Sequence, residues 1–253
     1  MEAYNPFSLK EKNILVTGAS SGIGRGIAIE CSKMGAQLII TGRNENRLKE
    51  TMSLLEGKGH KTIIADLTEQ GGLASLVDQL PKLDGLVLNA GIVELKPISF
   101  ATQRHFENIY KINLFAPIEL FRLIVKKKLY NSGFSVVTID SVAGSFDFAP
   151  GNSIYGSGKA ALKSFLKYAS LEYCSKNVRI NTISPGMVLT PLVMDGEVDS
   201  VQLEKVISDI PINRWGKPED IAFATVFLLS SASSYITGID IIVDGGYTIP
   251  FHR

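Results

Sequence analysis

Short apolar runs rich in valine and isoleucine alternate with longer amphipathic segments along almost the whole of this chain. The apolar runs, predicted to be strands, lie at residues 14–17, 37–41, 62–65, 85–88, 134–139, 179–183 and 239–243. The amphipathic segments, predicted to be helices, include residues 23–34, 45–56, 103–128, 160–173 and 218–229. Apolar strands separated by helices are typical of a parallel sheet with a helix on each crossover. We therefore predict an α/β fold, a doubly wound parallel sheet of about seven strands with helices on both faces.

Nothing in the composition divides the chain or attaches it to a polyanion. No linker or repeat interrupts it, so residues 1–253 are expected to form one domain. The 26 Lys and Arg residues nearly balance the 25 Asp and Glu residues, which gives no reason to expect binding to nucleic acid or to an anionic membrane. The N-terminal stretch lacks the apolar core of a signal peptide, and the His and Cys residues show no metal-ligand spacing. We expect a cytoplasmic protein without a metal site.

A glycine-rich loop follows the first predicted strand and leads directly into a helix. It contains Gly18, Ser20, Ser21, Gly22, Ile23 and Gly24. Glycines allow the backbone to turn tightly and to approach a pyrophosphate, and the first amides of a helix bind anions. In this position the loop predicts a Rossmann-like nucleotide-binding fold in which these six residues contact the cofactor.

The end of the second predicted strand indicates which cofactor this is. A carboxylate at this point binds the ribose 2′-hydroxyl of NAD, whereas an arginine suits the 2′-phosphate of NADP. Gly42 stands at the carboxylate position and Arg43 follows it. We expect Arg43 to contact the phosphate and NADP(H) to be preferred over NAD(H), although a solvated arginine would also explain the residue.

The third and fourth predicted strands also end in candidate cofactor contacts. Asp66, followed by Leu67, can accept a hydrogen bond from the adenine amino group or can cap the next helix. Asn89, Ala90 and Gly91 can bring the backbone close to the adenosine ribose, although Asn89 can equally bracket neighbouring strands. Because ligands bind beyond the carboxyl ends of parallel strands, these residues are predicted to lie at the cofactor site.

Tyr155 and Lys159 are the strongest candidates for catalysis. On a helix, a spacing of four residues puts both side chains on one face. An ammonium near a phenol stabilises the phenolate, which suits the phenol to general acid and base work. Ser141 ends the fifth predicted strand, and the loop after it can bring its hydroxyl to the same place. There the hydroxyl can polarise a carbonyl oxygen or orient an alcohol.

These motifs resemble the short-chain dehydrogenase/reductase family in its single-domain form. The resemblance runs from about residue 12 to residue 247 and includes the glycine loop, Asn89-Ala90-Gly91, Asn113, Ser141, Tyr155, Lys159 and Pro185-Gly186 in the family's order. It implies that Tyr155 exchanges a proton with the substrate. It also implies that Lys159 assists Tyr155 and binds the nicotinamide ribose, and that Ser141 holds the substrate oxygen. By the same resemblance, Asn113 positions a water beside Lys159. Contacts with the nicotinamide end of the cofactor are expected from Pro185, Gly186, Val188 and Thr190.

The chain departs from the family pattern at several positions. Leu88 stands where a second asparagine is usual, and Asp140 replaces a small residue directly before Ser141. Strand alternation turns Asp140 away from Ser141, and no role is predicted for it. Gly156 and Gly158 replace alanine or serine in the catalytic helix, which indicates either neutral variation or a close approach of substrate or cofactor.

The resemblance predicts an NADP(H)-dependent oxidoreductase that interconverts a carbonyl group and a secondary alcohol. The C-terminal half is similar to the 3-oxoacyl-(acyl-carrier-protein) reductase branch, so the favoured substrate is a 3-oxoacyl thioester, which an acyl carrier protein can present. A sugar, a steroid or another small secondary alcohol stays open, as does a non-catalytic NADP-binding sensor or scaffold. The short spacing between tyrosine and lysine disfavours an enoyl reductase. Family members are commonly tetramers, so a homotetramer is expected.

Overall fold

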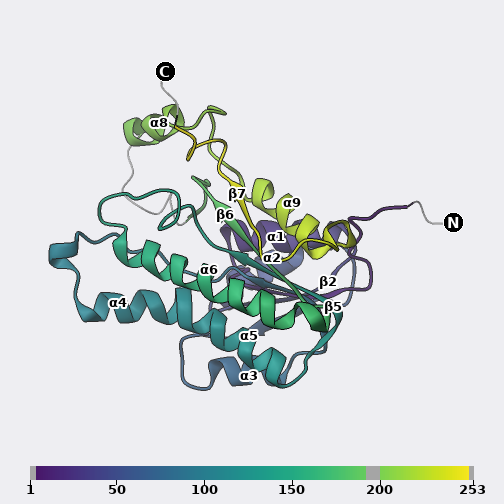
Figure 1. Ribbon diagram of the computed structural model, residues 1–253. Coiled ribbons are helices and arrows are strands. Elements are labelled where there is room, and N and C mark those ends of the chain that lie inside the picture. The colour runs from purple at the N-terminus through teal and green to yellow at the C-terminus, as the bar shows by residue number, and fades with distance from the viewer. Residues whose placement is uncertain (1–3, 192–199, 251–253) are drawn as a thin grey trace.

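The computed structural model describes residues 4–191 and 200–250, and its centre is a parallel sheet between layers of helices (Figure 1). The strand order is β3-β2-β1-β4-β5-β6-β7. The strands are β1 (Asn13–Thr17), β2 (Gln37–Gly42), β3 (Lys61–Ile64), β4 (Leu83–Leu88), β5 (Tyr130–Ile139), β6 (Arg179–Pro185) and β7 (Asp240–Val243). Every neighbouring pair is parallel. The predicted fold class and all the predicted strands are confirmed.

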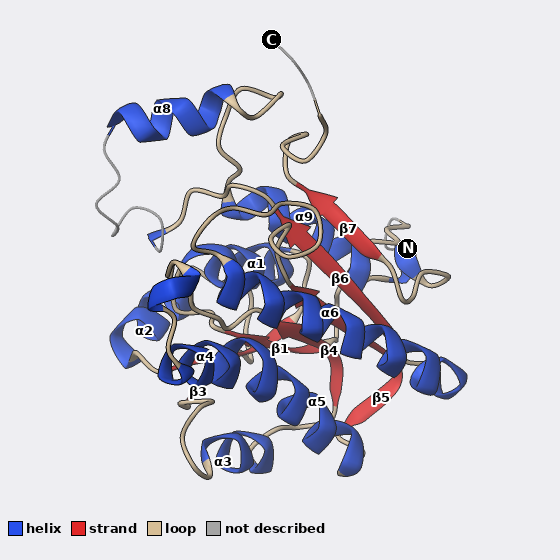
Figure 2. Cartoon of the chain, turned by 60° about the vertical axis from the view of Figure 1, so that its left-hand side comes forward, coloured by secondary structure: helices blue, strands red, loops and turns tan. Residues whose placement is uncertain are grey.

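Helices cover both faces of the sheet (Figure 2). One face carries α1 (Gly22–Lys33), α2 (Glu45–Ser53) and α9 (Pro218–Leu229). The other carries α3 (Gly72–Asp78), α4 (Gln103–Tyr110), α5 (Ala116–Lys126) and α6 (Ser153–Tyr173). Helix α8 (Ser200–Ser208) stands apart from these layers, on the side of the C-terminus. No described helix combines the length and the apolar character that a membrane span requires.

The alternation of side chains along β1 shows why the strands read as continuous apolar runs. Leu15 points into the core shared with α3, α5 and α6. Its neighbours Ile14 and Val16 point into the opposite core, against α1 and α9. A strand that is buried on both faces needs apolar residues at every position, because successive side chains point to opposite sides.

The long predicted helix over residues 103–128 is divided in the structure. Helix α4 ends at Tyr110, a π-helical turn spans Lys111–Phe115, and α5 begins at Ala116. Pro117 explains the irregularity, because it has no amide hydrogen to donate to the carbonyl of Asn113 four residues earlier. Asn113 therefore lies in a turn of the kind that often occurs at functional sites.

Helix α6 begins at Ser153, seven residues before the predicted start, and it includes Gly156 and Gly158. Both glycines pack closely against this chain itself. A Cβ on Gly156 would lie 3.1 Å from the amide nitrogen of Gly144, and one on Gly158 would lie 3.3 Å from the ring of Tyr110. The two glycines therefore let α6 approach the loop after β5 and helix α4.

We expect Gly144→Ala to destabilise the protein more than Gly71→Ala. Both glycines have positive φ angles, +79° and +82°, so both substitutions carry about 1–2 kcal/mol of backbone strain. At Gly144 the new methyl group would also overlap the carbonyl oxygen of Gly156, whereas nothing lies within 4 Å at Gly71. The overlap should lower the free energy of unfolding by about 2 kcal/mol more. Urea unfolding measures both values, and equal losses would contradict the packing argument.

Candidate active site

A cavity of about 600 Å³ opens at the carboxyl ends of the central strands. It spans the boundary between β1 and β4, where the strand order reverses and where doubly wound sheets bind ligands. Most of the predicted site residues line it, namely Gly18, Ser20, Ser21, Gly22, Ile23, Arg43, Asp66, Leu67, Asn89, Ala90, Gly91, Tyr155, Lys159 and Thr190. The other predicted residues, which are Gly24, Asn113, Ser141, Pro185, Gly186 and Val188, lie outside its lining.

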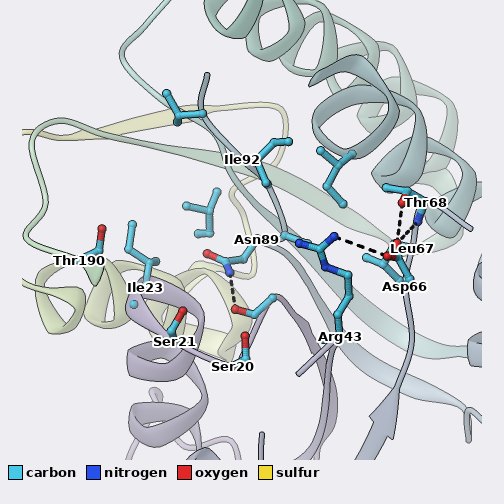
Figure 3. A pocket seen from close by; sticks show the side chains of 18 of the residues that line it. Ser20, Ser21, Ile23, Arg43, Asp66, Leu67, Thr68, Asn89, Ile92 and Thr190 are labelled. Atoms are coloured by element: carbon cyan, nitrogen blue, oxygen red, sulfur yellow. Dashed lines mark hydrogen bonds and ion pairs between the residues drawn. The ribbon is translucent and has the colours of Figure 1, made fainter. Parts of the chain in front are cut away.

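The glycine loop forms the floor at one end of this cavity (Figure 3). Gly18 adopts a φ of +65°, and a Cβ there would lie 2.9 Å from the Cα of Ala90. A Cβ on Gly24 would collide with the carbonyl oxygen of Gly18. Ser21 is the N-cap of α1, yet its side chain makes no capping hydrogen bond. The side chain of Ser21 therefore leaves the first amides of α1 uncapped, and Gly22 and Ile23 at this end of the helix line the cavity.

Thr17, which the sequence analysis did not single out, joins this loop to the end of β4. Its hydroxyl donates a hydrogen bond to the carbonyl of Val87 at 3.1 Å and accepts from the amides of Asn89 at 2.9 Å and Ala90 at 3.1 Å. The Asn89 side chain donates to the carbonyl oxygens of Thr17 at 3.0 Å and Gly18 at 3.2 Å. Asn89 thus brackets the two strands, the structural alternative considered for it, while it also lines the cavity.

Arg25 holds the same loop from its other side and was also missed. Its guanidinium donates to the carbonyl of Ser20 at 2.7 Å, to Glu50 at 2.9 Å and to the hydroxyl of Thr51 at 3.0 Å. A cation near the start of a helix opposes the helix dipole, so it needs such partners. That unfavourable position is the signal that could have identified Arg25.

Arg43 and Asp66 face each other across the cavity mouth (Figure 3). The Arg43 guanidinium lies 3.6 Å from the Asp66 carboxylate and is 71% exposed. Asp66 also accepts hydrogen bonds from the amide and the hydroxyl of Thr68, at 2.8 and 2.6 Å. Partial burial opposes ionisation, but the bonds from Thr68 and the charge of Arg43 outweigh it and lower the pKa of Asp66. Helix α3 is capped by Gly71, so the proposed helix-capping role of Asp66 is wrong.

Arg47 in α2 is a second cation on the same side of the cavity. Sequence reasoning missed Arg47 because α2 begins between the two arginines, at Glu45. The rule that residues four apart share a helix face therefore does not apply to Arg43 and Arg47. The structure places both arginines on the cavity wall, next to Ser20 of the glycine loop.

Tyr155 and Lys159 lie on one face of α6, as their spacing predicted, and both line the cavity. The Lys159 ammonium lies 5.8 Å from the centre of the Tyr155 ring and donates a 2.9 Å hydrogen bond to the carbonyl of Ile139 in β5. Lys159 is only 4% exposed. A buried ammonium with a fixed donor direction provides a positive charge beside the phenol that solvent screens weakly.

Asn113 and Ser141 lie outside the cavity lining. The Asn113 side chain accepts from the amide of Ile92 at 2.9 Å and donates to its carbonyl at 2.7 Å, which fixes the segment after Gly91. The Ser141 hydroxyl accepts from the amide of Ala143 at 3.1 Å. The catalytic roles implied for both residues remain predictions.

The predicted nicotinamide contacts lie at the end of β6 and beyond it. The carbonyl of Pro185 accepts a hydrogen bond from the amide of Val142, and the amide of Gly186 donates to the carbonyl of Val243. Val188 is buried, and Thr190 lies over the glycine loop, where a Cβ on Gly22 would be 3.3 Å from its methyl group. Only Thr190 of this group lines the cavity.

Asp140, for which no role was predicted, borders the cavity, but its carboxylate is buried. Its side chain is 0% exposed, and the Lys163 ammonium lies 3.3 Å from one of its oxygens. Burial is the main influence and raises the pKa of Asp140 to about 6, although the charges of Lys159 and Lys163 oppose this change. A carboxyl group with such a pKa changes its charge close to neutral pH.

The raised pKa of Asp140 predicts how stability depends on pH. Between about pH 4 and pH 6 the folded protein binds this proton more tightly than the unfolded chain, so the stabilisation is complete at low pH and is lost as the pH rises through 6. Relative to Asp140→Asn, the wild type should lose about 2 kcal/mol of unfolding free energy between pH 4 and pH 7. Urea unfolding of both proteins at several pH values measures this difference, and a constant difference would contradict the assignment.

Within the described residues, no group of three or more His, Cys, Asp or Glu side chains is placed to hold a metal ion.

Comparison with known proteins agrees with this geometry. A family model described as enoyl-(acyl carrier protein) reductase matches residues 18–248. The 3-oxoacyl-(acyl-carrier-protein) reductase FabG of Rickettsia felis is 36% identical over 239 residues, which cover 94% of this chain and 97% of the relative. The glucose 1-dehydrogenase of Gluconobacter oxydans is 31% identical, with 94% and 92% covered. The solved Pseudomonas aeruginosa RhlG complex with NADP has a TM-score of 0.90 at 28% identity, with 98% of this chain and 100% of that chain covered. The resemblance drawn from the motifs is confirmed, and the chain belongs to the short-chain dehydrogenase/reductase family of oxidoreductases.

Proposed function

We propose that this oxidoreductase uses NADP(H) to interconvert a carbonyl group and a secondary alcohol, with Tyr155 as the general acid and base. The observation that carries the proposal is that Tyr155 and Lys159 line the same cavity as the glycine loop. A proton donor and a nucleotide-binding loop in one cavity meet the two requirements of such a reaction.

The residues present fit a bound NADP(H). Gly18, Ser20, Ser21 and Gly22 of the glycine loop line the cavity, and the N-terminus of α1 offers amides to a pyrophosphate. Arg43 and Arg47 supply positive charge on the wall next to that loop, which suits a 2′-phosphate. When bound, the cofactor supplies or accepts the hydride.

The proton transfer is the work of this chain's own residues. In carbonyl reduction the Tyr155 phenol donates its proton to the carbonyl oxygen, and in alcohol oxidation it accepts the hydroxyl proton. The Lys159 ammonium, fixed by the carbonyl of Ile139, stabilises the phenolate that reduction leaves. Ser141 would hold the substrate oxygen, and Asn113 would hold a water that links Lys159 to solvent, from which the Tyr155 phenolate regains its proton.

We favour a 3-oxoacyl thioester as the substrate, because a 3-oxoacyl-(acyl-carrier-protein) reductase is 36% identical to this chain over nearly its full length. The exposed rings of Phe146 and Phe148, in the loop after β5, can contact a hydrocarbon portion of such a substrate. The predicted substrate segment 187–194 lies partly outside the described residues, from 192 onward.

A sugar or another small secondary alcohol is the second candidate, because a glucose 1-dehydrogenase is 31% identical with similar coverage. The enoyl reduction named by the family description fits the site less well. That reaction adds hydrogen across a carbon–carbon double bond, and the four-residue spacing of Tyr155 and Lys159 resembles the carbonyl reductases. A non-catalytic sensor has no use for a buried lysine beside a cavity-lining tyrosine.

Removal of one hydroxyl group tests the proposed role of Tyr155. We expect Tyr155→Phe to lower kcat by about 10²- to 10⁴-fold while the Kd for NADPH stays near the wild-type value. The assay follows NADPH oxidation with a 3-oxoacyl thioester, a keto sugar, a ketosteroid and a diketone. Tyr110→Phe is the matched control, since the Tyr110 hydroxyl contacts α6 at Ser157 but Tyr110 does not line the described cavity.

The substrate on which the tyrosine-dependent turnover is fastest identifies the substrate class. Tight NADPH binding without turnover of any panel member would favour the sensor. Substantial turnover by Tyr155→Phe would show that another group transfers the proton.

A charge-removing substitution tests the proposed cofactor preference. Arg43→Gln should raise the Kd for NADPH about tenfold or more and leave the Kd for NADH nearly unchanged, because only NADPH carries the phosphate. Fluorescence titration measures both constants. Arg122→Gln, which removes an exposed arginine paired with Glu119 in α5, is the control for net charge. Equal weakening of both cofactors, or tighter binding of NADH by the wild type, would contradict the preference.

A further inference from the structure

We propose that Asp140 is a positioning residue that sets the pH range of the proton transfer by offsetting the charge of Lys159. This inference rests on the proposed function, because it concerns the proton that Tyr155 exchanges. Asp140 is a departure from the family pattern, and its place in the fold connects it to the catalytic pair.

The backbone fixes Asp140 at the end of β5. Its amide donates a 2.8 Å hydrogen bond to the carbonyl of Ile183 in β6, which continues the β5–β6 ladder by one residue. The side chain is completely buried, and the Lys163 ammonium lies 3.3 Å from one of its carboxylate oxygens. Asp140 nevertheless lines the cavity, together with Ile139, Tyr155 and Lys159. A buried carboxylate is costly to ionise, so the charge of Asp140 depends on the cations that face it.

Two lysines of α6 face this carboxylate, and one further carboxylate lies nearby in β7. The Lys163 ammonium is 3.3 Å from Asp140 but only 2.8 Å from Asp240. It also donates to the hydroxyls of Ser145 and Ser184, at 3.1 and 3.0 Å. The carboxylate of Asp240 accepts a further bond from the Ser184 hydroxyl at 2.8 Å. Lys163 is therefore held closest by Asp240, and it is shared between two carboxylates.

Lys159 is the other cation at Asp140. Its ammonium donates to the carbonyl of Ile139, the residue directly before Asp140, which places the positive charge beside this end of β5. The charge of Lys159 is the largest influence that opposes the effect of burial on the Asp140 carboxyl. By reciprocity, the ionised carboxylate offsets part of the positive field that Lys159 exerts on Tyr155.

The titration of Asp140 then gives the site two charge states. Because burial raises the pKa of Asp140 to about 6, the carboxyl is neutral in acid and ionised at and above neutral pH. In the ionised state, the phenolate of Tyr155 receives less stabilisation from Lys159. Alcohol oxidation, which needs the phenolate, should therefore begin at a higher pH than it would without Asp140.

Neutral variants of Asp140 test this inference. In Asp140→Asn, the midpoint of the rise of kcat/KM with pH for alcohol oxidation should move to lower pH by about one unit. Asp240→Asn is the matched control, because it removes the carboxylate that lies closest to Lys163. It should move the midpoint by less than half of the change that Asp140→Asn produces. Asp140→Ser, which restores the small residue usual in the family, is the second variant if the asparagine protein does not fold.

A substrate-free measurement separates this inference from the proposed function. Tyr155→Phe removes one tyrosinate from the absorbance, and the difference between proteins with and without this substitution isolates the signal of Tyr155. This difference is measured once with Asp140 present and once in Asp140→Asn. The pH midpoint of the signal should be about one unit lower in Asp140→Asn, as in the kinetics. Unchanged midpoints in kinetics and absorbance, or an equal shift in Asp240→Asn, would overturn the role of Asp140. A shift in absorbance without turnover of any substrate would count against the proposed function and leave the role of Asp140 at Lys159 supported.

Discussion

The hydrogen bond from the Lys159 ammonium to the carbonyl of Ile139 is the contact on which the geometry of the site depends. It ties a long helix to the end of a central strand at a depth where Lys159 is almost completely buried. A buried ammonium needs fixed acceptors, so the bond determines how α6 lies on the sheet and where Tyr155 stands one turn earlier. The close packing of Gly156 against Gly144 permits this approach.

A second junction fixes the cofactor end of the cavity independently. Thr17 and Asn89 join the ends of β1 and β4, the two strands between which the order of the sheet reverses. Arg25 holds the outer side of the glycine loop through the carbonyl of Ser20. The cavity is thus shaped mainly by strand ends and helix starts, whose positions the core fixes, and this rigidity suits a reaction that depends on orientation.

Sequence patterns predicted the scaffold and most of the cavity wall, because these depend on local rules. Burial on both faces makes a strand apolar throughout, as β1 shows, and glycines mark the loop where a Cβ would collide. The spacing of Tyr155 and Lys159 predicted a shared helix face because helical geometry is fixed. The division of the long helix at Asn113 was missed, although Pro117 signalled it.

The residues that the sequence could not assign depend on contacts between distant segments. Asp140, Lys163 and Asp240 come from β5, α6 and β7, and no local pattern connects them. Their cluster has a consequence for how such a chain changes over time. A substitution that introduces Lys163 can occur first, because the new ammonium pairs with Asp240 at 2.8 Å. A substitution that introduces Asp140 before Lys163 would create a buried carboxylate that is faced by Lys159 but not by Lys163. The order of substitutions is therefore constrained: once both are present, loss of Lys163 alone leaves Asp240 without its ammonium and Asp140 with the charge of Lys159, so Lys163 becomes difficult to lose, whereas Asp140 can still revert to a small residue because Lys163 keeps Asp240.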